Sequence, residues 1–125
     1  MSKQVFISFA GNDRHWVEKL QKWNDEGKLG TDIKVTSERN DYRQEGKGAI
    51  KKELNNLIQG ASKAVFLVGK DTHDRKWVDH EIQQAQQRGK EILVARIPGT
   101  KGGKPSALSK YKEIPLHPDS LKKHL

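Results

Sequence analysis

The sequence predicts an α/β domain in which helices cover both faces of a parallel β-sheet. Apolar runs of strand length alternate with segments whose apolar residues recur at helical spacing. The strongest runs are also near-continuous, which is typical of parallel strands buried on both faces. Alternation of strands and helices is how such sheets are built, with right-handed crossovers. The length of 125 residues fits one domain, so we expect residues 1–125 to fold as a single domain.

Short apolar runs mark the expected strands. Three are near-continuous, at residues 5–9, 64–68 and 92–95, and a shorter one covers residues 33–35. A weaker run at residues 113–116 is the candidate for the last strand.

The expected helices lie between these runs and are recognised by apolar stripes and terminal signals. The stripes are Trp16, Val17, Leu20 and Trp23, with Asn12 or Asp13 as N-cap and Gly27 past the end; Ile50, Leu54, Leu57 and Ile58, ending near Gly60; and Val78, Ile82 and Ala85, ending at Gly89. A short last helix begins near Pro118. Two long loops, 36–48 and 98–109, remain, and we expect the second to lie at the surface.

Composition excludes several classes of site. The absence of cysteine excludes disulfides and thiolate zinc sites, and the histidines show no paired spacing, so no metal site is expected. No apolar run approaches the roughly 20 residues that span a bilayer, and the N-terminal segment does not resemble a signal peptide. These features predict a cytoplasmic protein without a membrane partner.

The net charge of +8 favours partners that carry phosphate or acidic groups, although it could serve solubility alone. The basic residues are scattered, and the densest stretch, residues 101–112, has few aromatic side chains. Such a stretch is a poor stacking platform, which argues against a nucleic-acid partner.

Two familiar motifs are not met. The glycine-rich segment 99–104 lacks the spacing of a phosphate-binding P-loop, because Pro98 replaces the first glycine and Pro105 follows Lys104. A phosphoacceptor receiver domain would use Asp13 and Asp71, but the acidic cluster that holds its magnesium ion is missing.

Glu81 is the most informative polar residue. It follows Trp77 by one helical turn and lies about 60° from the centre of the stripe formed by Val78, Ile82 and Ala85. We therefore expect its carboxylate at the edge of the core-facing side, where it is paired, used, or placed there by an error in the helix register that we assign. An ion pair with Lys76, Arg75 or a lysine from another element is the structural alternative.

The run 64–72, the segment from Lys76 through Trp77 and Glu81 to Ala85, and the following residues 89–92 resemble the TIR-like proteins of bacterial Thoeris antiphage defence and their archaeal relatives. Residues 5–9 are similar to the first strand of TIR domains. The resemblance covers residues 3–98. Residues 37–46 depart from the pattern, because they lack the Pro-Gly pair of signalling TIR domains, which puts assembly through that loop in doubt.

The resemblance implies a flavodoxin-like three-layer sandwich with five parallel strands in the order 2-1-3-4-5. It also implies cleavage of NAD by a glutamate early in the helix after the third strand, a position that Glu81 matches. NAD would be a substrate, so no resident cofactor is expected. The implied product is a cyclic or modified ADP-ribose signal, and the implied partners are a separate effector protein or a second copy of the chain.

In this fold, ligands bind beyond the carboxyl ends of the first and third strands, where the strand order reverses. The expected substrate-binding residues there, with Trp77 from the helix, are Ser8, Phe9, Ala10, Gly11, Asn12, Gly69, Lys70 and Asp71. Core packing is an equal alternative for Phe9 and Trp77. One carboxylate can suffice, because nicotinamide leaves as a neutral base and needs no general acid.

Two other functions remain open on the sequence. The chain could be an inactive TIR-like module that binds other proteins, or a receptor that binds a nucleotide without cleaving it. All three functions are compatible with the same fold and a basic surface.

Overall fold

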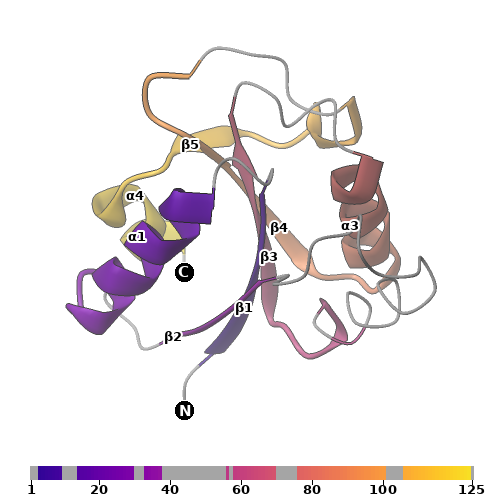
Figure 1. Ribbon diagram of the computed structural model, residues 1–125. Helices are drawn as coiled ribbons and strands as arrows, with labels where there is room; N and C mark the ends of the chain where they lie inside the picture. The colour runs from indigo at the N-terminus through magenta and orange to yellow at the C-terminus, as the bar shows by residue number, and fades with distance from the viewer. Residues whose placement is uncertain are drawn as a thin grey trace.

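The computed structural model describes residues 3–9, 14–29, 33–37, 56, 58–69, 76–100 and 106–124. Strands and helices alternate along the chain, as the sequence predicts (Figure 1). The elements are β1 (Lys3–Ser8), α1 (Arg14–Asp25), β2 (Ile33–Ser37), β3 (Lys63–Val68), α3 (Lys76–Gln87), β4 (Glu91–Arg96), the 3₁₀ turn η3 (Ser106–Leu108), β5 (Glu113–Pro115) and α4 (Pro118–His124).

The strands form one sheet in the order β2-β1-β3-β4-β5, and every pair of neighbours is parallel. The flavodoxin-like strand order that the family resemblance implies is therefore confirmed. Helices α1 and α4 cover one face of the sheet and α3 covers the other, which gives the three layers (Figure 1). Of the predicted second helix, residues 56, 58 and 59 are helical, and the rest lies outside the described residues.

The side chains of β1 divide between the two layers because alternate residues of a strand point to opposite faces. Val5 and Ile7 belong to what we call the α1-side cluster, and Phe6 belongs to the α3-side cluster. The α1-side cluster is Val5, Ile7, Phe9, Val17, Leu20, Trp23, Leu29, Val65, Leu67, Ala95, Ile97, Ile114, Leu116 and Leu121. The α3-side cluster is Phe6, Ile58, Ala61, Ala64, Phe66, Val68, Val78, Ile82, Ala85, Val94 and Leu108.

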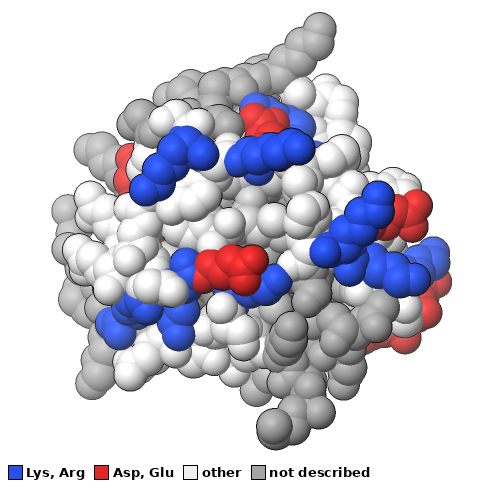
Figure 2. All heavy atoms as spheres, turned by 180° about the vertical axis from the view of Figure 1, so that it is seen from behind, with Lys and Arg blue, Asp and Glu red and all other residues white. Residues whose placement is uncertain are grey.

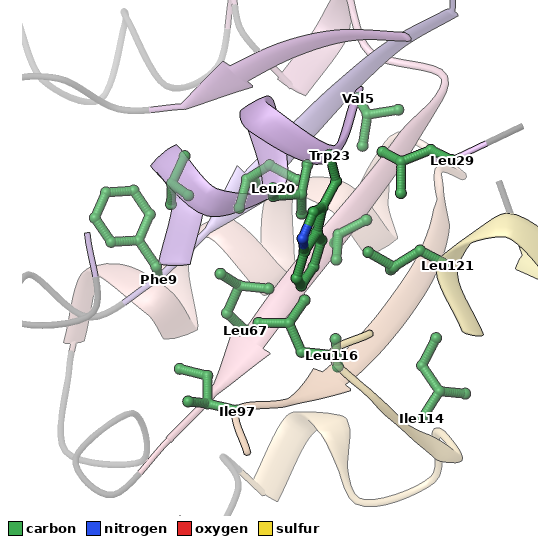
Figure 3. Close-up of a cluster of buried hydrophobic side chains, with 14 residues drawn as sticks. Val5, Phe9, Leu20, Trp23, Leu29, Leu67, Ile97, Ile114, Leu116 and Leu121 are labelled. Atoms are coloured by element: carbon green, nitrogen blue, oxygen red, sulfur yellow. The ribbon is translucent and has the colours of Figure 1, made fainter. Parts of the chain in front are cut away.

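Trp23 occupies the middle of the α1-side cluster, with Leu20 of its own helix beside it and Leu116 and Leu121 from the last elements nearby (Figure 3). Side chains from both ends of the chain thus fill the same layer. Burying a large aromatic ring in this way supplies more apolar area than any aliphatic residue could.

Glycines end the two long helices in the same manner. Gly27 and Gly89 have φ angles of 75° and 67°, a left-handed conformation that residues with a Cβ rarely adopt. Lys28 N–H donates to the Trp23 carbonyl at 2.9 Å, and Lys90 N–H donates to the Ala85 carbonyl at 3.0 Å. These are the six-to-one hydrogen bonds of the Schellman motif, and they confirm both predicted helix ends.

The prediction that the whole loop 98–109 lies at the surface is wrong at the C-terminal end of the loop. Pro98 and Gly99 are exposed, but Leu108 is fully buried in the α3-side cluster, where η3 carries it. A single leucine in a 3₁₀ turn shows no periodicity along the sequence, whereas the surrounding glycines and prolines do mark a loop.

Among the described residues, no helix combines the length and apolar character that a membrane crossing requires.

Candidate functional site

Ser8 and Glu81 are the buried polar or charged residues among those described, and each is 2% exposed. Ser8 follows Phe6 by two positions on β1, so its side chain points to the face that α3 covers. Glu81 lies on α3 between Val78 and Ile82, both of which are fully buried against that same face. One layer of the molecule therefore contains both groups.

Glu81 is more deeply buried than its position on the helix predicts. The sequence places it at the edge of the apolar stripe, whereas the residue is almost fully buried and its Oε2 atom is shielded from solvent. An ionised carboxylate in such a place is stable only when charges or hydrogen bonds compensate for the lost water. A carboxylate this deeply buried is uncommon away from functional sites, which marks Glu81 as a candidate functional group.

The start of α3 brings Glu81 near the carboxyl edge of the sheet. The helix begins at Lys76, after the carboxyl end of β3 at Val68, and it runs back along the sheet. Glu81 is five residues into it, roughly 7–8 Å along the axis. Ligands of open α/β sheets bind at this edge.

The other predicted site residues fall into three groups. Ser8 is at the end of β1, and Gly69 is buried directly after β3. Phe9 is 6% exposed and packs in the α1-side cluster, on the opposite face from Glu81, which matches its core-packing alternative. Trp77 lies in the first turn of α3, but its side chain is not described; Ala10, Gly11, Asn12, Lys70 and Asp71 lie outside the described residues.

Ser8 carries a hydroxyl group that is buried at the end of β1. Its Oγ is buried and has no hydrogen-bond partner among the residues that the structure describes. Leaving a buried hydroxyl in this state costs about 1–3 kcal/mol. A polar group left without a partner by the described residues, at the carboxyl end of a central strand, suits contact with a ligand.

Sequence reasoning did not identify Arg96, the last residue of β4. Its Nε donates to Oε1 of Glu113 at 2.6 Å, and its Nη2 donates to Oε2 at 3.0 Å. Its Nη1 is buried and has no hydrogen-bond partner in the described part of the chain. The signal in the sequence is a lone arginine that ends an apolar run, but its partner Glu113 is 17 residues away, and only the β4–β5 pairing brings the two together.

An open groove of about 520 Å³ lies elsewhere, along α1. His15, Glu18, Lys19, Lys22, Trp23, Glu26 and Lys28 line it. Lys19 Nζ lies 4.9 Å from the centre of the Trp16 ring and 5.8 Å from that of Trp23. The groove includes none of the predicted site residues and is on the other side of the sheet from Glu81, so we do not assign it to the candidate site.

The charged side chains and candidate metal ligands of the described residues form no second centre. Over the face seen in Figure 2, basic side chains are spread out, and several lie beside acidic ones. Among the residues described, no three histidine, aspartate or glutamate side chains come together as metal ligands would.

Comparison with known proteins supplies the family. Residues 6–102 match the model of the TIR-like domain of the Thoeris protein ThsB. A curated protein of Bacillus cereus (strain MSX-D12), the putative cyclic ADP-D-ribose synthase ThsB1, is 29% identical over 110 residues, which cover 78% of this chain and 53% of that protein. The chain thus spans about half the length of this relative.

Solved TIR domains share the fold. The TIR domain of the Toll-related receptor TRR-2 from Hydra magnipapillata superposes with a TM-score of 0.63 at 19% identity, covering 91% of this chain and 84% of that one. The TIR domains of the activated Roq1 resistosome give a TM-score of 0.55 at 20% identity, covering 78% and 58%. These likenesses concern the fold, and the family model covers most of the sequence. The chain therefore belongs to the family of TIR-like domains of the Thoeris protein ThsB.

Proposed function

We propose that this chain is an NAD-consuming enzyme whose product, a cyclic or otherwise modified ADP-ribose, acts as a signal in antiphage defence. The observation that carries the proposal is the Glu81 carboxylate, 2% exposed on α3 in the layer that also holds Ser8. Membership of the ThsB family supports the defence role. The name of the Bacillus cereus relative, a putative cyclic ADP-D-ribose synthase, supports the substrate class.

The chemistry needs one carboxylate. Cleavage breaks the bond between the ribose C1′ and the nicotinamide nitrogen, and the bonding electrons leave with nicotinamide as a neutral base. The ribose ring becomes oxocarbenium-like, and the negative charge of Glu81 would stabilise it or hold the ribose hydroxyls. Water then adds to C1′ and gives ADP-ribose, or a nucleophile within the same molecule adds and gives a cyclic product; either nucleophile loses one proton.

Ser8 and Gly69 supply the neighbouring contacts in this proposal. The Ser8 hydroxyl can donate to or accept from a ribose hydroxyl, and Gly69 lets the substrate approach the backbone after β3 closely. NAD is consumed, so we propose no resident cofactor. The signal would act on a separate effector protein.

The direct test is incubation of the protein with NAD at high protein concentration, with products followed by mass spectrometry. We expect release of nicotinamide together with ADP-ribose or a product lighter by one water. The measurement is repeated with a crowding agent, because assembly would concentrate the sites. NAD that stays intact in both conditions, while the protein binds another TIR domain, would contradict the enzyme and favour an interaction module.

A further inference from the structure

We propose that Arg96 binds the diphosphate of the nucleotide substrate, as an anion-binding residue at the carboxyl edge of the sheet. The inference rests on the proposed function, because it assumes that a nucleotide binds near Glu81. It adds a residue from β4 to a site that sequence reasoning built only from β1, β3 and α3.

Strand register places Arg96 on the correct face. Arg96 is opposite Val68 of β3, and Val94, two residues earlier on β4, belongs to the α3-side cluster. The Arg96 side chain therefore leaves the sheet on the face that α3 covers, which is also the face of Ser8 and Glu81.

The same register gives the spacing between Arg96 and Ser8. Phe66 of β3 is opposite both Ser8 and Val94, so Arg96 is two strands across from Ser8 and two residues nearer the carboxyl edge. Standard strand spacings put their Cα atoms about 12 Å apart. Both side chains leave the same face of the sheet, and an extended dinucleotide is long enough to contact both residues.

Glu113 fixes the orientation of the guanidinium group. Its two carboxylate oxygens accept from Nε and Nη2, and this bidentate pairing holds the guanidinium plane. The three nitrogens are coplanar around Cζ, so Nη1 lies on the side opposite the Glu113 carboxylate. Glu113 is on β5 opposite Val94, so β3 and the carboxyl edge are on the Nη1 side.

Nη1 is the nitrogen of the Arg96 guanidinium group that does not bind Glu113. It is buried without a hydrogen-bond partner among the described residues, although the side chain as a whole is 22% exposed. Anchoring the short strand β5 requires only Nε and Nη2. An anionic oxygen is the acceptor that suits a remaining guanidinium N–H, and in NAD the diphosphate carries the negative charge.

Calorimetric titration with ADP-ribose tests this assignment without requiring turnover. The main variant is the double replacement Arg96→Gln with Glu113→Gln, which removes both charges and leaves the net charge unchanged. Removing both partners leaves neither charge buried alone, so the fold should tolerate it. The matched control is Glu26→Gln with Lys28→Gln, which removes an exposed ion pair of 3.7 Å on the α1 side.

We expect the Arg96/Glu113 variant to bind ADP-ribose about tenfold more weakly, and the control to bind like the parent. Arg96→Lys is the second variant: its ammonium is a compact point charge without the planar fork that binds Glu113 on one side and a phosphate on the other, so its affinity for ADP-ribose should also fall. Melting temperatures verify that each variant is folded.

Two results would overturn the inference: one leaves the proposed function intact, and the other contradicts it as well. If the parent binds ADP-ribose and both Arg96 variants bind it equally well, Arg96 does not bind the diphosphate, and the proposed function stands. If the parent binds neither ADP-ribose nor NAD, the proposed function fails and the role of Arg96 fails with it.

Discussion

Replacing Glu81 by glutamine tests the carboxylate that the proposed reaction requires. The change keeps the shape of the side chain and removes its charge, so stabilisation of a positively charged ribose is lost while substrate contacts remain. We expect turnover of NAD to fall about 10²–10³-fold with little change in KM. Release of nicotinamide, measured over a range of NAD concentrations, separates the two quantities.

The control for this substitution is Glu18→Gln, which removes the same charge from an exposed position on α1. A melting measurement beside the assay detects any loss of fold in either variant. A folded Glu81→Gln protein that cleaves NAD at the parent rate would show that another group performs the chemistry.

Ser8→Ala should weaken ligand binding without lowering the stability of the fold. The Ser8 Oγ is buried without a hydrogen-bond partner in the described part of the chain, so removing it takes away a desolvation cost and no contact. We expect the melting temperature to stay the same or rise, while the affinity for ADP-ribose falls. Ser62→Ala, at an exposed position, serves as the control. A clear drop in melting temperature would mean that Ser8 is structural.

At the scale of single residues, the sequence predicts on which face of a helix a residue lies better than it predicts how deeply the residue is buried or what it contacts. Helical spacing correctly placed Glu81 next to the apolar stripe, because that relation is local. It did not predict burial to 2% exposure, since this depends on how α3 is seated on the sheet. Arg96 was missed for the same reason, because its environment is created by a strand pairing distant in sequence. The predictions for Lys70 and Asp71 stay untested.

Among the elements, η3 offers the sharpest stability test. Leu108 is fully buried in the α3-side cluster, so Leu108→Ala should lower the free energy of unfolding by about 2–5 kcal/mol. Urea denaturation measures the change, and Lys110→Ala, two residues on and exposed, is the control. Equal stabilities of the two variants would mean that η3 does not anchor this loop.

The regular elements were predictable because their signals are local and agree with one another. Continuous apolar runs identified β1, β3 and β4, and the positions of Gly27 and Gly89 marked the ends of α1 and α3. The structure shows both glycines at left-handed φ angles. Strand order is not a local property, and it was expected correctly only through the family resemblance. Leu108 shows where local reasoning fails, since one apolar residue in an irregular segment has no pattern.

At the scale of the whole molecule, we predict that residues 1–125 unfold as one cooperative unit. The two clusters share the strands of one sheet, so neither layer can persist once the sheet is lost. Unfolding curves in urea from tryptophan fluorescence and from far-UV circular dichroism should coincide. Two separated transitions would contradict the single-domain prediction.

The partition of β1 has a consequence for protein engineering. Its odd-numbered residues, Val5 and Ile7, support the layer under α1, whereas Ser8 and Phe6 face the layer with Glu81. Substitutions at sites that share no contacts, such as one on each face of the sheet, combine nearly additively. The α1-side cluster around Trp23 could therefore be repacked to raise stability. Residues of the opposite layer could then be varied in a separate library, because the sheet lies between the two sets of side chains.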